Sequence, residues 1–217
     1  MKISTVLAAA VLASTLVSSV DAGVILSPTS VTTDMGNRFM GAIGNTIDQS
    51  GLVTPFTSGV TDFDVYAPTS TSTQNASGHQ WWGALNTLGV TDFDLGATYN
   101  VARLAFWNAN AFFGMNQFRV LIDDNAAFSS ATDMGTFNAA FNQPLGQVFD
   151  LTDGTGRYVR FEHLSTHSSS SNMGEVAFDV SSAASIPEPG SFAILVVAAI
   201  GVAFNRRRQR QGGRQPN

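Results

Sequence analysis

Alternating apolar residues across the middle of the chain constrain its fold most strongly. Phe118, Val120 and Ile122 occupy every second position of NQFRVLIDDN, and GEVAFDV near residue 180 has the same period. Because alternate side chains of a strand lie on one face of a sheet, these runs predict strands with one buried face. Similar runs, separated by Gly, Asn, Asp and Ser clusters, are GVTDFDV, GVTDFDL, YNVARLAFW, GQVFDL and RYVRFEH. Short strands with such turns predict an all-β fold, an antiparallel β-sandwich.

The hexapeptide GVTDFD occurs twice, at 59–64 and 89–94. A duplicated unit would repeat beyond these positions, but VYAPTSTSTQN follows the first copy and LGATYN the second. We therefore interpret both copies as strands of independent origin. Two carboxylates at alternate positions of a strand share one face, so each Asp pair is expected on a solvent-facing side. The pairs are Asp62 with Asp64 and Asp92 with Asp94.

The N-terminal end of the chain has the pattern of a secretory signal. Lys2 supplies a positive charge, an apolar stretch diluted with Ser and Thr follows, and a small residue, Ala22, precedes Gly23. We predict that residues 1–22 form a signal helix that is cleaved before Gly23, so that the chain leaves the cytoplasm. The alternative of an N-terminal core helix fits poorly, because the polar residues fall on no single helical face.

Composition divides the rest of the chain. We expect a β-sandwich domain at 23–183, a Pro-Glu-Pro linker at 184–190, a short hydrophobic sorting helix at 191–205 and a basic cytoplasmic tail at 206–217. Cysteine is absent, so packing alone must hold the single core. Residues 23–183 contain 14 Asp and Glu against 5 Arg and no Lys. This acidic balance excludes nucleic acid as a partner and is compatible with cations or neutral sugars.

An apolar run of 13 residues, Phe192 to Phe204, lies near the C-terminus. As a helix it would rise about 20 Å, whereas the hydrocarbon core of a bilayer is about 30 Å thick. The run predicts a transmembrane-type helix that holds the chain in the membrane only temporarily. The arginines behind it are costly to translocate and keep the tail on the cytoplasmic side. They are Arg206, Arg207, Arg208 and Arg210.

A Pro-Glu-Pro sequence is followed by an apolar helix and an Arg cluster within about 25 residues. This arrangement resembles the PEP-CTERM sorting signal of exported proteins in Gram-negative bacteria. The resemblance implies that an exosortase recognises Pro187, Glu188 and Pro189. It also implies the secretion machinery as a partner, transient contact with the inner membrane, and a final place at the cell surface or in the extracellular matrix. An ordinary C-terminal anchor that is never processed remains the alternative.

A second resemblance lies in the strand motifs. FDLGATYNVARLAFWN, FRVLIDDNAAFSS, GRYVRFEHL and GEVAFDV occur in this order, and over residues 43–180 the chain is similar to discoidin or coagulation-factor type C domains. That family belongs to the galactose-binding-like jelly rolls. The resemblance therefore implies a jelly-roll form of the β-sandwich.

Members of this superfamily often carry a structural calcium, and the resemblance implies Asp48 and Glu175 as its oxygen ligands. Glu175 alternates away from its apolar neighbours in the strand and so need not lie in the core. The sequence departs from the family pattern at Gln49, because the family has Gly after the Asp. A carboxylate that caps a loop without metal is the alternative.

The resemblance also implies carbohydrate binding, through an aromatic ring that stacks on a sugar beside hydrogen-bonding side chains. Candidate residues for this contact are His79, Trp82 and Asn108. Adjacent tryptophans on a strand point to opposite faces, so at most one of Trp81 and Trp82 belongs to the core. For Trp107 we favour a place in the core at the mouth of the sandwich.

No catalytic pattern appears in the sequence. It lacks a GxSxG motif, a phosphate-binding glycine loop and a cysteine nucleophile. His163 and His167 have a zinc-like spacing, but that spacing is diagnostic on a helix and these residues follow a strand. We therefore expect an exported, non-enzymatic surface or matrix protein for adhesion or carbohydrate binding. The alternatives are a purely structural surface protein and a secreted hydrolase.

Overall fold

A computed structural model describes residues 23–38, 41–73, 78–108 and 113–183. The predicted signal at 1–22 and the linker, sorting helix and basic tail at 184–217 lie outside the described residues. Within the described ranges, no helix has both the length and the apolar character needed to cross a membrane. The described domain belongs to one compact unit that ends at Ser182.

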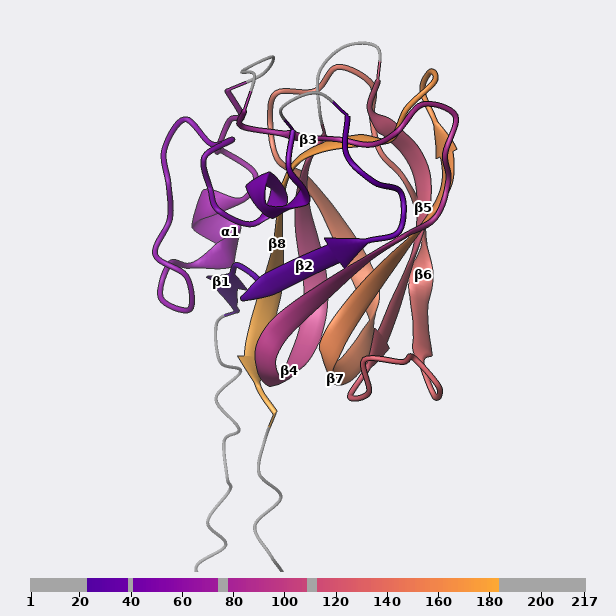
Figure 1. Ribbon diagram of the computed structural model, residues 1–217. Helices are drawn as coiled ribbons and strands as arrows, with labels where there is room; N and C mark the ends of the chain where they lie inside the picture. Colours follow the sequence, from indigo (N-terminus) through magenta and orange to yellow (C-terminus); the bar gives the residue numbers. More distant parts are fainter. Residues whose placement is uncertain (1–22, 39–40, 74–77, 109–112, 184–217) are drawn as a thin grey trace, which may run out of the picture. The chain divides into compact units, whose positions relative to one another are not determined.

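Eight strands and two short helical turns make up the described fold (Figure 1). They are β1 (Val24–Leu26), β2 (Ser30–Thr33), the 3-10 helix η1 (Ile43–Thr46), α1 (Phe63–Tyr66), β3 (Trp81–Trp82), β4 (Val90–Asn108), β5 (Met115–Asp123), β6 (Thr132–Asn138), β7 (Gln147–Thr166) and β8 (Asn172–Ser182). All pairings between these strands are antiparallel. The predicted all-β, antiparallel sandwich is confirmed.

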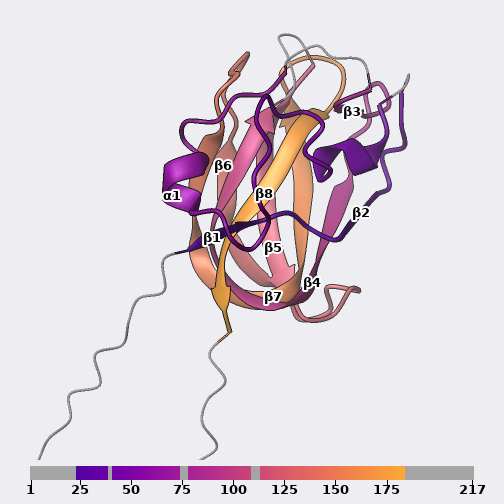
Figure 2. The ribbon, with the colours of Figure 1, turned by 90° about the vertical axis from the view of Figure 1, so that its left-hand side faces the viewer.

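The long strands β4 and β7 bend in the middle and contribute to both layers of the sandwich (Figure 2). The first half of β4 pairs with β2 and with the second half of β7, which also pairs with β5. After a register shift between Asp94 and Tyr99, the second half of β4 pairs with the first half of β7 and with β8. Gly96 lies in this bend with a φ of +85°, a conformation that favours glycine. Two strands thus connect the layers covalently.

The main hydrophobic core lies between the two layers. Phe93 from β4 packs against Phe161 of β7, with ring centroids 5.0 Å apart, and against Phe178 of β8 at 5.9 Å. Phe106 and Phe118 pack across the layers at 5.7 Å. The residues predicted to share buried faces all lie in this core and are Phe118, Val120, Ile122, Val176, Phe178 and Val180. The period of two therefore identified the inner faces correctly.

A second hydrophobic cluster covers the outer face of β4 and β8. Ala105, Trp107 and Ala177 from these strands meet Phe56 and Phe63 from the segment between β2 and β3. Trp107 is fully buried, as expected for a core residue, but it lies in this outer cluster rather than at the mouth of the sandwich. The β8 strand is therefore covered on both faces along most of its length.

The repeated hexapeptide adopts two different structures, and the strand predicted at 59–65 is wrong. In the first copy Asp62 caps α1, where its Oδ1 accepts a hydrogen bond from the Val65 amide at 3.0 Å. Phe63 then turns into the outer cluster, and the Arg103 guanidinium lies 4.7 Å from its ring centroid. The second copy forms β4, with Phe93 in the main core. Tertiary packing of the phenylalanine thus overrides an identical local sequence.

The aspartates of the second copy lie on the solvent side of β4, as predicted, and each meets an arginine of β7. Arg160 donates two hydrogen bonds to Asp92, at 2.6 and 2.7 Å, and Arg157 donates two to Asp94, both at 2.8 Å. Such paired geometry is the strong form of an Arg–carboxylate contact. Ion pairs therefore connect β4 and β7 on the outer face of the layer that also contains β2 and β5.

His163 links three segments from a buried position on β7. Its Nδ1 lies 2.5 Å from the Ser171 hydroxyl and its Nε2 lies 3.0 Å from the Thr91 hydroxyl. The Trp81 ring packs edge-on at 6.0 Å between centroids. Burial lowers the pKa of His163 to about 3, so the imidazole stays neutral in the folded domain.

We predict that this histidine makes the domain sensitive to mild acid. The unfolded chain binds a proton near pH 6.5, whereas the folded imidazole does so only near pH 3. Its contribution to stability is therefore complete above pH 6.5 and declines as the pH falls towards 3, by at most about 1.4 kcal/mol per pH unit.

Urea unfolding of the native domain and of His163→Gln at about pH 7.5 and about pH 5 checks this expectation. The native free energy of unfolding should decrease more between the two pH values than that of the variant. Equal decreases in both proteins would contradict it.

Candidate functional site

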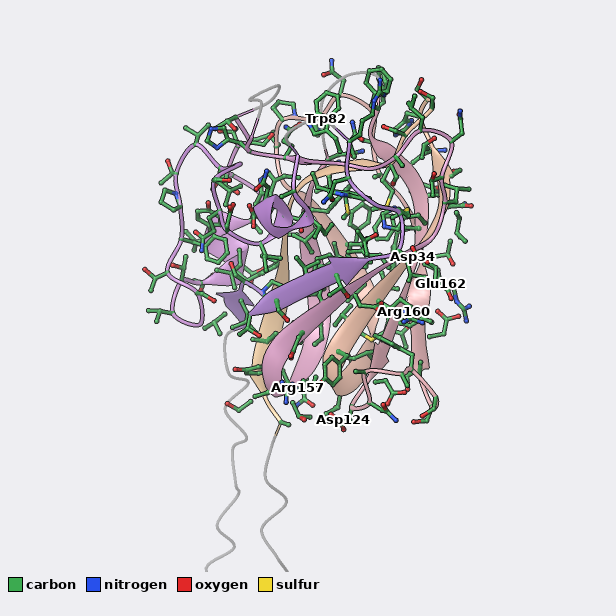
Figure 3. All side chains as sticks on the ribbon, in the orientation of Figure 1. Asp34, Trp82, Asp124, Arg157, Arg160 and Glu162 are labelled. Atoms are coloured by element: carbon green, nitrogen blue, oxygen red, sulfur yellow. The ribbon has the colours of Figure 1, made fainter. Side chains whose placement is uncertain are left out.

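The double tryptophan of β3 divides between the core and the surface, as predicted. Trp81 is fully buried, and its indole N–H donates to the Asn37 side-chain oxygen at 2.9 Å and to the Gly36 carbonyl at 3.2 Å. Trp82 is half-buried. It lies at the end of the molecule opposite to Arg157 (Figure 3).

Trp82 belongs to a group of half-buried or exposed rings, which we call the aromatic rim and define as Trp82, Phe113, Phe141 and His167. The Trp82 and Phe113 ring centroids lie 6.1 Å apart. The next residue, Gly114, accepts a hydrogen bond from the His167 amide at 3.0 Å, and the Phe141 ring lies 5.3 Å from the His167 ring. His167 Nε2 lies 2.9 Å from the Ala139 carbonyl oxygen. The rim thus presents apolar faces beside one imidazole.

The other two predicted sugar contacts, His79 and Asn108, differ in their exposure. His79 is exposed in the segment that leads into β3, close to the rim in sequence. Asn108 is fully buried, and its amide donates to the Met115 carbonyl at 2.8 Å and to the Ala140 carbonyl at 3.1 Å. Because its side chain holds the backbone beneath the rim and has no exposed surface, we do not retain Asn108 as a sugar contact.

Phe113, Phe141 and His167 were not singled out as sugar contacts by sequence reasoning. Each lies in a polar or glycine-containing connection between strands, where an aromatic residue has no place in the alternating pattern. An aromatic residue in such a connection is the signal that could have identified them.

A buried carboxylate lies below the loops, on the outer face of β8. Glu175 stands opposite Trp107 in the strand pairing and has no exposed surface. Neither of its carboxylate oxygens has a hydrogen-bond partner within the described part of the chain. The prediction that Glu175 points away from the main core is confirmed, but the segment covering the outer face buries it as well. A carboxylate without partners in such a place is costly unless it is protonated or bound to a cation.

The loop at 48–51 covers this carboxylate. Asp48 accepts a hydrogen bond from the Ser50 amide at 2.9 Å, and the Ser50 hydroxyl is buried without a partner among the described residues. Gly51 lies against the backbone, since a Cβ there would be 2.8 Å from the His79 carbonyl oxygen and 3.4 Å from that of Gly174. The 48–51 loop therefore packs against the backbone of His79 and of Gly174, the residue before Glu175.

Gln49 occupies the position where the family resemblance implies a glycine. Its φ is +63°, in the left-handed region that glycine adopts without strain. The side-chain oxygen of Gln49 accepts a hydrogen bond from the Phe56 amide at 2.8 Å, and its amide nitrogen lies 3.3 Å from the Ser27 hydroxyl. These two contacts hold the strained residue in place.

Burial raises the pKa of Glu175 well above its usual range, and the negative charge of Asp48 raises it further. The backbone N–H of Gln49 lies near the Glu175 carboxylate and lowers its pKa, although it is outside hydrogen-bonding geometry. The described residues hold no cluster of three or more His, Cys, Asp or Glu side chains able to bind a metal. Carboxylate, hydroxyl and carbonyl oxygens are the ligand types that calcium takes, and Asp48, Glu175 and Ser50 could supply the first two, so the calcium site stays a prediction.

Comparison with solved structures finds CBM32 domains of similar fold. The chain is similar to the CBM32 domain of AlyQ, solved in complex with 4,5-unsaturated mannuronic acid, at 17% identity and a TM-score of 0.50 over 71% of this chain and 96% of that chain. It is also similar to the CBM32-1 and CBM32-2 domains of ZmpB from Clostridium perfringens, at 9% identity and a TM-score of 0.51 over 70% of this chain and 35% of that chain.

A third similar structure is the C-terminal domain of a chitobiase from Bacteroides fragilis, at 11% identity and a TM-score of 0.50 over 72% of this chain and 97% of that chain. No protein-family model and no curated protein sequence matched the chain. At these identities the similarity shows the fold alone, which is an antiparallel β-sandwich like that of these CBM32 domains.

We predict that, because of Glu175, the stability of the domain falls as the pH rises and increases when calcium is added. In EDTA, the raised pKa gives a contribution to stability that is complete below about pH 4.5 and is lost as the pH rises through the folded pKa. Calcium should reverse this loss, because it replaces the proton on Glu175; a hundredfold excess over Kd stabilises by about 2.7 kcal/mol.

Thermal unfolding of the native domain, Glu175→Gln and the matched control Glu162→Gln, in EDTA and in calcium, tests both effects. Glu162 is a suitable control because it is half-exposed on the other layer and paired with Arg119. Only Glu175→Gln should abolish the calcium response. An unchanged Tm of the native domain in EDTA and calcium would refute the metal site.

Proposed function

We propose that this protein is an exported, non-enzymatic surface protein whose β-sandwich binds a neutral glycan at the aromatic rim. The observation that carries the proposal is the CBM32-like fold with half-buried and exposed rings gathered at one end. Aromatic rings stack on the apolar face of a pyranose. The acidic balance of the domain disfavours anionic polysaccharides, so we assign a neutral sugar as the ligand class.

Trp82 is the central stacking residue in this proposal, and His79 and His167 are the hydrogen-bonding groups beside it. Their imidazoles act as donor or acceptor, which suits sugar hydroxyls. Phe113 and Phe141 extend the apolar surface on the side of Trp82 and His167. The rim thus offers a shallow contact area, as expected for recognition of an exposed glycan rather than for catalysis.

A structural calcium held by Asp48 and Glu175, with the Ser50 hydroxyl, accompanies this function. When bound, the cation supplies positive charge to two carboxylates that otherwise repel each other. Gly51 touches the His79 backbone, so a stable 48–51 loop supports the segment that leads to Trp82. The cation in this proposal stabilises the base of the rim and does not contact the sugar.

Export and sorting complete the proposal. The signal at 1–22 directs secretion, and the exosortase recognises Pro187, Glu188 and Pro189 while the apolar helix and its arginines hold the chain in the inner membrane. Release at this motif would place the domain at the cell surface or in extracellular polysaccharide. The last described strand, β8, ends at Ser182, and the linker begins at residue 184.

We predict that replacing Trp82 with Ala weakens glycan binding by about tenfold or more, corresponding to about 1.4 kcal/mol. The physical reason is loss of the stacking surface, so Phe141→Ala should weaken binding as well. Phe128→Ala is the matched control, because Phe128 is a half-buried ring that packs over Arg160, far from the rim in the fold.

The measurement is a glycan array of neutral and acidic sugars with residues 23–183, in calcium and in EDTA, followed by calorimetry of the best ligand. An absence of binding at millimolar sugar in both conditions would leave a purely structural surface protein as the function. Equal losses in Trp82→Ala and Phe128→Ala would place the sugar elsewhere.

We predict that changing Pro187 and Pro189 to Ala leaves an unprocessed precursor in the inner membrane, since the sorting enzyme loses its recognition motif. Mass spectrometry of the C-terminus in membrane and extracellular fractions measures the effect. Pro144→Ala, within the domain, is the control for loss of a proline. An identical mature C-terminus in the native and double-variant proteins would rule out sorting at this motif.

A further inference from the structure

The first described residue, Gly23, is held between two elements that are far apart in the sequence. Its carbonyl accepts a hydrogen bond from the Phe63 amide at the start of α1, at 3.2 Å. The next residue, Val24, pairs with Val180 of β8 and forms an isolated bridge with Asp62. The beginning of β1 is therefore fixed in position rather than trailing from the domain (Figure 1).

Gly23 lies directly against the Asp179 carboxylate. A Cβ at position 23 would stand 1.7 Å from Asp179 Oδ1 and 2.9 Å from Oδ2, so no side chain fits there unless Asp179 moves. The backbone nitrogen of Gly23 is two bonds from that Cβ position, which places it within about 4 Å of Oδ1. This separation is within the range of an ion pair, if the nitrogen carries a charge.

The surroundings of this nitrogen have an excess of negative charge. Asp179 accepts a hydrogen bond from Arg103 Nε at 2.6 Å, and Asp64 of α1 binds the same guanidinium. Burial raises the pKa of Asp179 and the contact with Arg103 lowers it, whereas the negative charges of Asp64 and Asp62 raise it further. Asp62 is therefore a third carboxylate near this pair. Asp179 is 4% exposed, so water compensates this charge poorly. One guanidinium thus binds two carboxylates, and a third lies near them.

We propose that removal of the signal before Gly23 creates an α-ammonium group that forms an ion pair with Asp179 and completes the Arg103 network. Cleavage adds one water molecule across the Ala22–Gly23 peptide bond: the new carboxylate leaves with Ala22, and Gly23 retains the amine. The neutral amide of the precursor becomes a group that is mostly charged at neutral pH. The inference rests on the proposed export, since the signal must be removed at this bond.

The composition of the chain provides a direct test. Its one lysine is Lys2, within the predicted signal, so the mature chain has a single primary amine, that of Gly23. Acetylation therefore removes only this positive charge, whereas reductive dimethylation keeps the charge and adds similar bulk. The two reactions give a matched pair on residues 23–183, which contain every described strand and both hydrophobic clusters.

We expect the acetylated domain to have a Tm about 2–4 °C below that of the dimethylated domain, as for the loss of about 1 kcal/mol in a domain of this size. Carbon-13 NMR of the labelled dimethylamine should give a higher pKa in the folded domain than in urea, because Asp179, Asp64 and Asp62 outnumber Arg103 nearby. Equal Tm values together with an equal amine pKa would overturn the proposal.

Asp179→Asn tests the partner, because acetylation should no longer change the Tm when this carboxylate is absent. If the variant does not fold, the NMR titration of the native domain decides alone. Mass spectrometry of the natural N-terminus separates this inference from the proposed function. A chain that starts elsewhere would refute cleavage before Gly23, whereas an ordinary amine pKa in a chain that starts at Gly23 would refute the ion pair.

Discussion

Contacts between phenylalanine rings hold the two layers of this domain together. Phe93, Phe161 and Phe178 come from three strands and meet between the layers, with Phe93 at 5.0 Å from the second ring and 5.9 Å from the third. The bends of β4 and β7 bring these rings together, because each strand leaves one layer and enters the other. In a chain without cysteine, this packing does what a disulfide between layers does in other sandwiches. The loops at both ends depend on this core for their positions.

The covering of the outer face has a chemical consequence. Because the segment between β2 and β3 packs on β4 and β8, the polar side chains on that face of β8 are removed from water. Asp179 meets Arg103, whereas Glu175 has no hydrogen-bond partner among the described residues. The same packing that buries Trp107 thus buries two carboxylates, and each of our two proposals adds a positive charge beside one of them.

Much of the fold follows from the alternating pattern. Val176, Phe178 and Val180 lie in the main core as the period predicts, and Asp92 and Asp94 lie on the solvent side. The pattern failed at the first GVTDFD, where a capping aspartate and a partner surface for Phe63 produce a helix instead. A local sequence does not contain that surface.

The candidate site was less accessible from sequence. Trp82 was identified because neighbouring positions on a strand face opposite ways, and the structure agrees with that division. Asn108 was chosen as a polar group beside an aromatic, but it is buried and its amide donates to two backbone carbonyls. The complete burial of Glu175 depends on a segment more than a hundred residues earlier in the chain, and the alternation within its own strand contains no information about that cover.

The position of β8 has a mechanical consequence. β8 is the last described strand, and it lies between β4 on one edge and β1 and β3 on the other. A force applied to the chain beyond Ser182 would act along the axis of a strand that is bonded on both edges. The load would therefore be resisted in shear by many hydrogen bonds at once, instead of opening them one after another. Such an arrangement suits a domain that must remain folded while it is pulled by its C-terminal side.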